Sequence, residues 1–592
     1  MKINRQAAFV FLVCFAVFYG SPARWLADSR HALLLSESLL RYGMASLENY
    51  FPSPPPSTSP AVAWNDVAGV RYDNGHLYYL FPPGGSLLAV PLVAVFNAAG
   101  FHVIGPDGLY DATMELAMQA FIASLLMAGL CVGWFAMASR LLPPRLSALF
   151  AFACAFATPV WSSASRVLWA DSWGIALLTL SLWFLVQSTT SRSRSLLQVL
   201  LLAMLVAVKP TYMISALGIA AYSLGSRRSA RRLILIAVGG AGLAVTAYGL
   251  ASVFHILPAY YWVGRLSVSG FGQGLAGVLF SPGRGLFLYV PVLWLVAWLL
   301  VRHWTALPNR PLVILALVVT ALDVAVVACF PRWSGGQCFG PRLLVGALPW
   351  LMFIGLATTA AAVNAPTSGR ARAGEFLAAV VLVAVGVALH GRGALSPAPM
   401  RWNYEPANVD AFPSRLWDWR VPPFLADLVP DRLLPGAPLY LTSDGARSFL
   451  GPGWSGYGGP LGMQPAAMRA AGIPADEDML RDWRWTDGSD SIVRLHSTDV
   501  RDRRITLTVI PFLVPGQLTE QLVGIYLDDR LVREARLTVM RPTRLTVDMP
   551  GDVSGCMAEL RLHLPNAARP AALGLGSDSR SLGLMVLKIE AQ

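Results

Sequence analysis

Residues 6–31 read QAAFVFLVCFAVFYGSPARWLADSRH and join an apolar run to a short charged stretch. Residues 6–24 are apolar enough to cross a bilayer, and two basic residues before them favour a cytoplasmic N-terminus. The run is long for a signal peptide, so we expect a retained anchor. Asp28 then emerges at the far membrane face, where a carboxylate is costly unless it has a use. Two interpretations stay open: Asp28 caps a helix predicted over residues 30–43, or it is a catalytic base.

The composition indicates an integral membrane protein. The chain has 592 residues, of which 55% are hydrophobic and 14% charged. A net charge of +12 does not indicate nucleic-acid binding here, because the arginines lie in short loops between apolar segments. Six cysteines are scattered without the spacing of a metal site or a disulfide framework, so we predict no metal site.

Hydropathy predicts eleven membrane-spanning segments. They are residues 6–24, 112–138, 146–160, 169–187, 195–208, 210–224, 233–254, 285–301, 311–330, 342–363 and 374–390. The predicted cytoplasmic segments carry basic residues and no Asp or Glu, as the positive-inside rule requires of short loops. These basic residues are Lys2, Arg5, Arg140, Arg145, Arg192, Arg194, Arg227, Arg228, Arg231, Arg232, Arg302, Arg310, Arg370 and Arg372. An odd number of spans places everything after residue 390 outside, on the side of Asp28.

The first predicted outer loop, residues 25–111, is the longest. It contains the predicted helix 30–43, the tetrapeptide FPPG at 81–84 and an apolar run over residues 86–101. That run is short for a span, and a crossing there would invert the charge pattern downstream. We therefore expect an interfacial or re-entrant helix.

Three later outer loops place cations where the positive-inside rule disfavours them. These cations are Lys209, Arg284 in SPGRG (281–285) and Arg342 in WSGGQCFGPR (333–342). Snorkelling to lipid phosphates would explain any one of them, whereas several converging on one face favour a bound anionic headgroup. The planar fork of Arg and the compact charge of Lys both suit phosphate oxygens.

Asp28 just after the first span, the helix behind it and the FPPG, SPGRG and WSGGQCFGPR elements resemble the GT-C superfamily of membrane glycosyltransferases. Within it they are similar to bacterial relatives of protein mannosyltransferases and lipid-A aminoarabinose transferases. The resemblance covers residues 1–390 and implies a polytopic α-helical fold, a polyprenyl-phosphate-linked sugar donor and a catalytic role for Asp28. Many members carry two neighbouring acids at this position, whereas Ser29 follows here. A second carboxylate would come from Asp73 or Asp171, and a requirement for a divalent metal stays open.

The residues themselves suit glycosyl transfer. Moving a sugar from a lipid phosphate to a hydroxyl requires a base and a stabilised phosphate leaving group. Asp28 supplies the base and the three outer cations bind the phosphate; one inverting displacement needs only one base. Tyr212 is a candidate supporting group. So is His31, three residues beyond Asp28 on the same predicted helical face, although a lone His more often packs or hydrogen-bonds.

We therefore predict an inverting glycosyltransferase of a bacterial inner membrane that needs no cofactor. Its active site faces the periplasm, and its acceptor is a glycan, a lipid or a protein. Two alternatives stay open: a ligase that transfers a preassembled lipid-linked oligosaccharide, and a flippase or transporter of lipid-linked sugars. Transporters usually carry charges near the bilayer midplane, whereas the unusual charges of this chain gather at the predicted outer boundary.

The chain changes character after the last predicted span. Residues 391–440 form a Trp-rich connecting segment that we expect over the outer headgroups, and residues 441–592 form a β-sandwich domain outside the cytoplasm. The predicted strands are Ile492–Leu495, Ile505–Ile510, Leu522–Leu527, Leu531–Leu537, Leu545–Val547, Met557–Leu564 and Leu582–Ile589, with a hairpin turn at Asp528-Asp529-Arg530. Four aromatic residues either stack on sugar rings, as in a carbohydrate-binding module, or fill the sandwich core. They are Trp454, Tyr457, Trp483 and Trp485.

Overall fold

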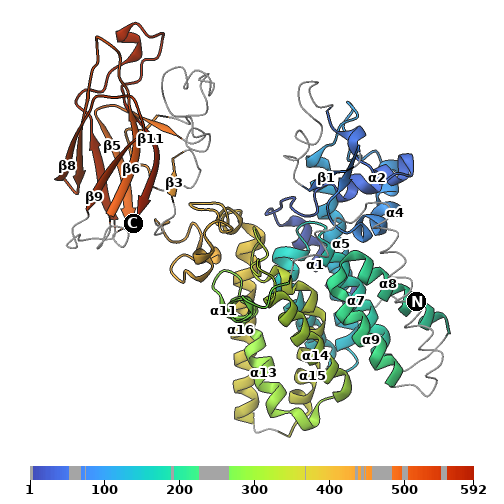
Figure 1. Cartoon of the computed structure of the whole chain (residues 1–592). Helices are drawn as coiled ribbons and strands as arrows, with labels where there is room; N and C mark the ends of the chain where they lie inside the picture. Colours follow the sequence, from blue (N-terminus) through green and yellow to red (C-terminus); the bar gives the residue numbers. More distant parts are fainter. Residues whose placement is uncertain are drawn as a thin grey trace. The chain divides into compact units, whose positions relative to one another are not determined.

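The computed structural model divides the chain into two compact units, Met1–Pro397 and Ala398–Gln592. The residues that the structure describes are 5–52, 69–73, 75–187, 192–225, 266–366, 369–431, 433, 438–441, 446, 449–455, 483–496, 504–548 and 557–591. Figure 1 labels the helices and strands of both units.

The first unit is built from helices and one small β-hairpin (Figure 1). Its helices are α1 (Arg5–Gly20), α2 (Ala32–Tyr42), α4 (Gly84–Ala98), α5 (Ala112–Ala138), α6 (Pro144–Phe156), α7 (Ala170–Val186), α8 (Arg192–Val208), α9 (Met213–Gly225), α11 (Phe271–Phe280), α12 (Leu286–Tyr289), α13 (Val292–Arg302), α14 (Arg310–Ala328), α15 (Leu348–Asn364) and α16 (Gly369–Leu395). Short helical turns include η1 (Glu48–Tyr50), η2 (Val160–Ala164), η3 (Pro210–Tyr212), η5 (Trp304–Ala306) and η6 (Arg342–Ala347). The hairpin strands are β1 (Val70–Asp73) and β2 (His76–Tyr79).

Each predicted span that falls on described residues contains a helix, whereas the predicted span 233–254 lies outside them. The predicted span 285–301 is divided into α12 and α13, because Pro291 lies between them and has no N–H to continue a helix. Among the described helices, four are long and apolar enough to cross a membrane: α5, α14, η6 together with α15, and α16. The other apolar helices are shorter, so the count of eleven spans stays a prediction.

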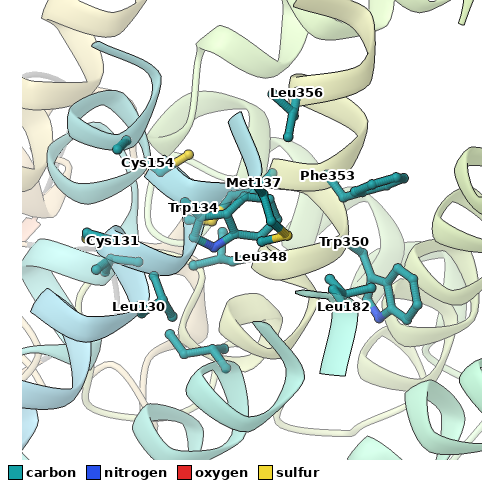
Figure 2. Packing of buried hydrophobic residues seen from close by; sticks show 14 of the residues in the cluster. Leu130, Cys131, Trp134, Met137, Cys154, Leu182, Leu348, Trp350, Phe353 and Leu356 are labelled. Atoms are coloured by element: carbon teal, nitrogen blue, oxygen red, sulfur yellow. The ribbon is translucent and has the colours of Figure 1, made fainter. Parts of the chain in front are cut away.

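The core of the first unit lies where α5 packs against α1, α6 and α7. Figure 2 shows Trp134 of α5 and Trp350 of α15 among buried aliphatic and sulfur-containing side chains. The indole of Trp350 donates from Nε1 to Oγ of Ser215 at 2.9 Å, which satisfies a polar atom that has no access to solvent. Helix α5 carries buried Glu115 and Gln119 near its start and is otherwise mostly apolar on all sides, as expected of a helix in the interior of a membrane protein.

The segment between α1 and α5 forms a second apolar cluster around α2, α4 and the hairpin. The predicted helix 30–43 is α2, which ends at Gly43 with a φ of 64°. The predicted run 86–101 is α4, and its first residue, Gly84, contacts α8. A Cβ at Gly84 would lie 2.3 Å from the carbonyl oxygen of Ala207, so only glycine allows this approach.

The second unit contains two antiparallel sheets, which confirms the predicted β-sandwich fold (Figure 1). One sheet has the order β5-β10-β7-β8; the other has the order β3-β11-β6-β9, with β4 paired to β11. The strands are β3 (Pro438–Tyr440), β4 (Arg484–Asp487), β5 (Asp490–His496), β6 (Arg504–Pro511), β7 (Gln521–Leu527), β8 (Arg530–Leu537), β9 (Thr543–Asp548), β10 (Met557–His563) and β11 (Leu582–Ala591). Aliphatic residues from both sheets share one core. The predicted turn between β7 and β8 is confirmed, with φ of 45° at Asp528 and 65° at Asp529.

The segment before this sandwich packs on itself. Trp402 is 3% exposed, its Nε1 donates to the carbonyl of Val421 at 2.7 Å, and the guanidinium of Arg415 lies 4.4 Å from its ring centre. The prediction that Trp402 anchors to headgroups is therefore wrong, because its ring is enclosed by protein. Trp419, by contrast, is 60% exposed and remains available for such contacts.

Candidate active site

Asp28 lies in the loop between α1 and α2 and forms an ion pair with Arg342, the first residue of η6. Nη2 of Arg342 donates to Oδ2 of Asp28. The Asp28 side chain is 45% exposed, whereas that of Arg342 is 14% exposed. The hydroxyl of Tyr79 donates to the Asp28 carbonyl at 2.6 Å and holds the backbone there. Two residues that the sequence analysis selected separately thus form one contact.

Arg342 is held by the ring beneath it and by the loop before it. Its guanidinium carbon lies 3.9 Å from the centre of the Trp169 ring, a cation–π distance. The preceding loop turns through Gly335, Gly336 and Gly340, whose φ values of 76°, 67° and 66° are rarely adopted by other residues. The glycines of the WSGGQCFGPR element therefore shape the approach of Arg342 to Asp28.

Arg284 supports this loop. Its side chain is buried, and it donates to the carbonyl oxygens of Ser334 at 2.9 Å, Gly336 at 2.9 Å and Gly283 at 2.8 Å. The guanidinium thus faces protein carbonyls and ties the SPGRG turn to the loop that carries Arg342. The direct contact of Arg284 with phosphate stays a prediction, and its contacts with the three loop carbonyls indicate a positioning role as well.

A second ion pair joins Lys209, just before η3, to Asp171 in the first turn of α7. Nζ of Lys209 lies 2.9 Å from each carboxylate oxygen of Asp171, and the hydroxyl of Tyr212 donates to Oδ1 at 3.1 Å. The Tyr212 ring fits between two glycines: an added Cβ would lie 2.2 Å from it at Gly174 and 3.3 Å from it at Gly346. These contacts fix α7, η3 and η6 against one another.

The two ion pairs belong to one cluster, because Arg342 interacts electrostatically with Asp171 as well as with Asp28. Asp323 of α14 interacts with Lys209, and both line a small cavity of about 30 Å³, which has room for water. The sequence analysis missed Asp323. A lone acid within an otherwise apolar span was the signal that could have found it.

Helix α2 is not capped by Asp28. Its N-cap is His31, with φ 71° and ψ 5° and no capping hydrogen bond from its own side chain. Instead Glu115, in the first turn of α5, accepts hydrogen bonds from the backbone N–H groups of His31 and Leu33, each at 2.8 Å. The capping interpretation of Asp28 is therefore wrong, since a distant carboxylate satisfies these helix-start donors.

His31 is a packing residue. Because α2 starts after it, His31 and Asp28 do not share a helical face as predicted. Its ring centre lies 5.3 Å from that of Phe51 and 4.6 Å from that of Tyr110. Burial and the neighbouring Arg30 lower the pKa of His31 from 6.5 to about 3, so the ring is neutral at physiological pH.

Arg166 fixes the chain just before Asp28. It is buried and donates from Nη1 to the carbonyl of Ser21 at 3.0 Å and from Nη2 to the carbonyl of Phe18. Both carbonyls lie at the C-terminal end of α1. A cation there satisfies carbonyl acceptors and interacts favourably with the negative end of the helix dipole.

Of the two candidates for a second acid, Asp171 pairs with Lys209 and also interacts electrostatically with Arg342. Asp73 instead pairs with Arg71 within the β1–β2 hairpin. Among the residues that the structure describes, no group of three or more His, Cys, Asp or Glu is placed to hold a metal ion.

Of the aromatic residues proposed for sugar stacking, Trp483 is buried in the second unit, and Trp454 and Trp485 are partly buried. Nε1 of Trp454 donates to the carbonyl of Ile492 at 2.7 Å. Trp483 is 7% exposed and meets Trp485 edge-on, with ring centres 6.2 Å apart. These contacts support the core-filling interpretation, while Tyr457 lies outside the described residues.

No protein-family model matches the chain, and no curated protein matches it. Two solved structures that resemble it are those of ArnT from Cupriavidus metallidurans, one in the apo state and one bound to undecaprenyl phosphate. The identities are 16% and 15%, and the TM-score is 0.41 in both cases. The likeness covers 67% of this chain and 66% of each ArnT chain.

Proposed function

We propose that the chain is an inverting glycosyltransferase that moves a sugar from a polyprenyl-phosphate donor to a hydroxyl group of a glycan, lipid or protein acceptor. The observation that carries this proposal is the Asp28–Arg342 ion pair. It places a carboxylate suited to act as a base beside a guanidinium suited to bind phosphate. The apolar helices of the first unit supply the membrane setting in which a polyprenyl chain is soluble.

The reaction needs one displacement. The acceptor oxygen bonds to the anomeric carbon while the bond from that carbon to the phosphate oxygen breaks. The acceptor proton passes to the Asp28 carboxylate, and the electron pair of the broken bond leaves on the phosphate. Arg342 and Lys209 stabilise the charge that grows there, because fixed cations act most strongly where water is excluded.

Donor binding also changes the partner of each cation. Without ligand, Arg342 contacts Asp28 and Lys209 contacts Asp171, so both cations are already paired with carboxylates. The phosphodiester of the donor carries one negative charge and two non-bridging oxygens, as a carboxylate does, and these oxygens can replace the carboxylates as partners of the two cations. The side chain of Asp28 is more exposed than that of Arg342. It can therefore move aside when phosphate binds, and it then becomes free to accept the proton. The donor therefore binds before the acceptor reacts.

We assign the active site to the periplasmic face of a bacterial inner membrane. The absence of acidic residues from the predicted cytoplasmic segments supports this orientation, and so does the parity of the predicted spans. The same parity puts residues 391–592 on the side of Asp28, where the β-sandwich domain would help to present the acceptor. In right-side-out spheroplasts a protease should cut this domain from outside; cleavage only in inverted vesicles would contradict the orientation.

Mass spectrometry of lipids retained by the purified full-length protein tests the proposal. We expect a polyprenyl phosphate, or its sugar conjugate, in a ratio to protein that falls when Arg342 is replaced by Ala. A matched sample of an unrelated membrane protein from the same cells controls for bulk lipid. Retention of no polyprenyl phosphate species above that control would overturn the proposed donor class.

A further inference from the structure

Two buried hydrogen-bond donors beside Asp28 have no acceptor among the described residues: Nε of Arg342 and Nε1 of Trp169. Both belong to the same stacked pair, with the guanidinium carbon 3.9 Å from the ring centre. Trp169 is 5% exposed, so bulk water does not readily solvate its N–H. Buried donors without a partner are rare in folded proteins and point to a bound water, ion or ligand.

The charges around this pair favour an anion. Trp169 is the N-cap of α7, a helix of 17 residues, and its side chain makes no capping hydrogen bond. The positive end of the helix dipole therefore faces the same region as Arg342 and Lys209, which contacts Asp171 in the first turn of α7. A ligand rich in acceptor oxygens suits two cations, a helix start and two free N–H groups.

We propose that Trp169 is a binding residue for the donor phosphate. Its indole N–H donates to one phosphate oxygen, while its ring face holds Arg342 so that Nε donates to another. This inference rests on the proposed function and deepens it, because it selects a tetrahedral oxyanion with several acceptors. The Asp28 carboxylate leaves both of these N–H groups unsatisfied.

The test compares undecaprenyl phosphate with uncharged undecaprenol as probes for the purified full-length protein in nanodiscs. Trp169→Phe keeps an aromatic face under Arg342 but removes the N–H. We expect it to weaken undecaprenyl phosphate binding about tenfold, the scale for one hydrogen bond to a charged group, and to leave undecaprenol binding unchanged. Trp169→His restores a ring N–H and should recover part of the loss.

Trp173 provides a matched control. It lies one turn further along α7, is 8% exposed, and its Nε1 also has no acceptor among the described residues, but it is not the ring stacked on Arg342. Trp173→Phe should therefore change undecaprenyl phosphate binding less than about twofold. Equal affinity of wild type and Trp169→Phe, or equal losses in the two Phe variants, would overturn the role of Trp169. If wild type did not prefer undecaprenyl phosphate to undecaprenol, the proposed function would fail as well.

Discussion

Arg342 donates from Nη2 to Oδ2 of Asp28 across a separation of 314 residues. This contact joins the loop after α1 to the glycine-rich loop before η6, and it brings a base candidate to a phosphate-binding candidate. Trp169 beneath Arg342 and Arg284 behind its loop hold the guanidinium in place. Arg284 thus positions the loop, whereas Trp169 both holds Arg342 and is proposed to contact the phosphate.

Loss of a phosphate-binding cation should weaken transfer without unfolding the protein. Arg342→Ala and Lys209→Ala should each lower kcat/KM for the sugar donor. The loss should correspond to about 2–4 kcal/mol of activation free energy, the scale for one preorganised hydrogen-bond donor. Arg342→Lys keeps the charge but not the fork or the ring contact, so most of the loss should remain. Full activity of Arg342→Lys would contradict a role for the fork.

Arg284→Ala should behave differently, because Arg284 contacts loop carbonyls. Removing it leaves those buried acceptors unsatisfied, which costs about 1–3 kcal/mol each in protein stability. We expect a lower Tm together with lower activity, whereas Arg342→Lys should lower activity with little change in Tm, because a cation stays beside the half-exposed Asp28. A stable Arg284→Ala protein with a selective loss of donor binding would support the direct phosphate role.

Glu115→Gln should destabilise the protein, because the two oxygens of Glu115 accept from the N–H groups of His31 and Leu33, whereas Gln has one acceptor oxygen. We expect a loss of about 2 kcal/mol, the scale for a buried N–H left without an acceptor. Asp111→Asn is the matched control: Asp111 is the N-cap of α5, and Asn caps helices equally well. Thermal unfolding in detergent measures both variants, and equal Tm values for them would contradict the role of Glu115.

His31 should make the protein less stable in acid. Its pKa is about 3 in the folded protein and 6.5 when unfolded, so the unfolded chain binds more protons between these values. The contribution of neutral His31 to the free energy of unfolding is fully present above pH 6.5 and is lost as the pH falls toward 3. At pH 5 the loss from this one group is about 2 kcal/mol.

His31→Asn tests this dependence, because Asn tolerates the φ of 71° and does not titrate. The Tm of wild type should fall more steeply between pH 7 and pH 5 than that of His31→Asn. Parallel curves would show that His31 does not contribute to the acid sensitivity.

The β-sandwich domain should affect acceptor binding more than chemistry. Deleting residues 441–592 should raise the acceptor KM more than it lowers kcat, the pattern for binding lost without transition-state contacts. Trp483 is 7% exposed, so its ring offers little surface for stacking on the acceptor. A deletion that abolished kcat at saturating acceptor would contradict this division of roles.

Local patterns made much of the fold predictable. Hydropathy located the long apolar helices, and alternation located β5 to β11 and the Asp528–Asp529 turn, because both depend on neighbouring residues. Helix α11 and strands β1 to β4 were not predicted. Charge at the ends of apolar runs selected Asp28, Lys209 and Arg342 but did not show which residues form ion pairs with one another. The pairing required contacts between distant segments, which periodicity does not encode.

The roles that were not predicted also depend on contacts between distant segments. Arg284 and Arg166 bind backbone carbonyls, acceptors that every residue carries and that leave no mark in the sequence. Asp28 before a helix looks like a cap, yet Glu115 from another helix takes that role. Trp169 was not selected from the sequence, because its ring lies beneath Arg342 only in the folded chain.

The central claim is that Asp28 is the base of the transfer, and turnover by Asp28→Asn tests it most directly. Asn keeps the shape of the side chain but cannot accept the acceptor proton, so the rate of sugar transfer from the donor identified by mass spectrometry should fall by at least about 10²-fold. The variant should remain folded, with a Tm near that of wild type, and should still retain the intact donor. Substantial turnover by a folded Asp28→Asn protein would contradict the account.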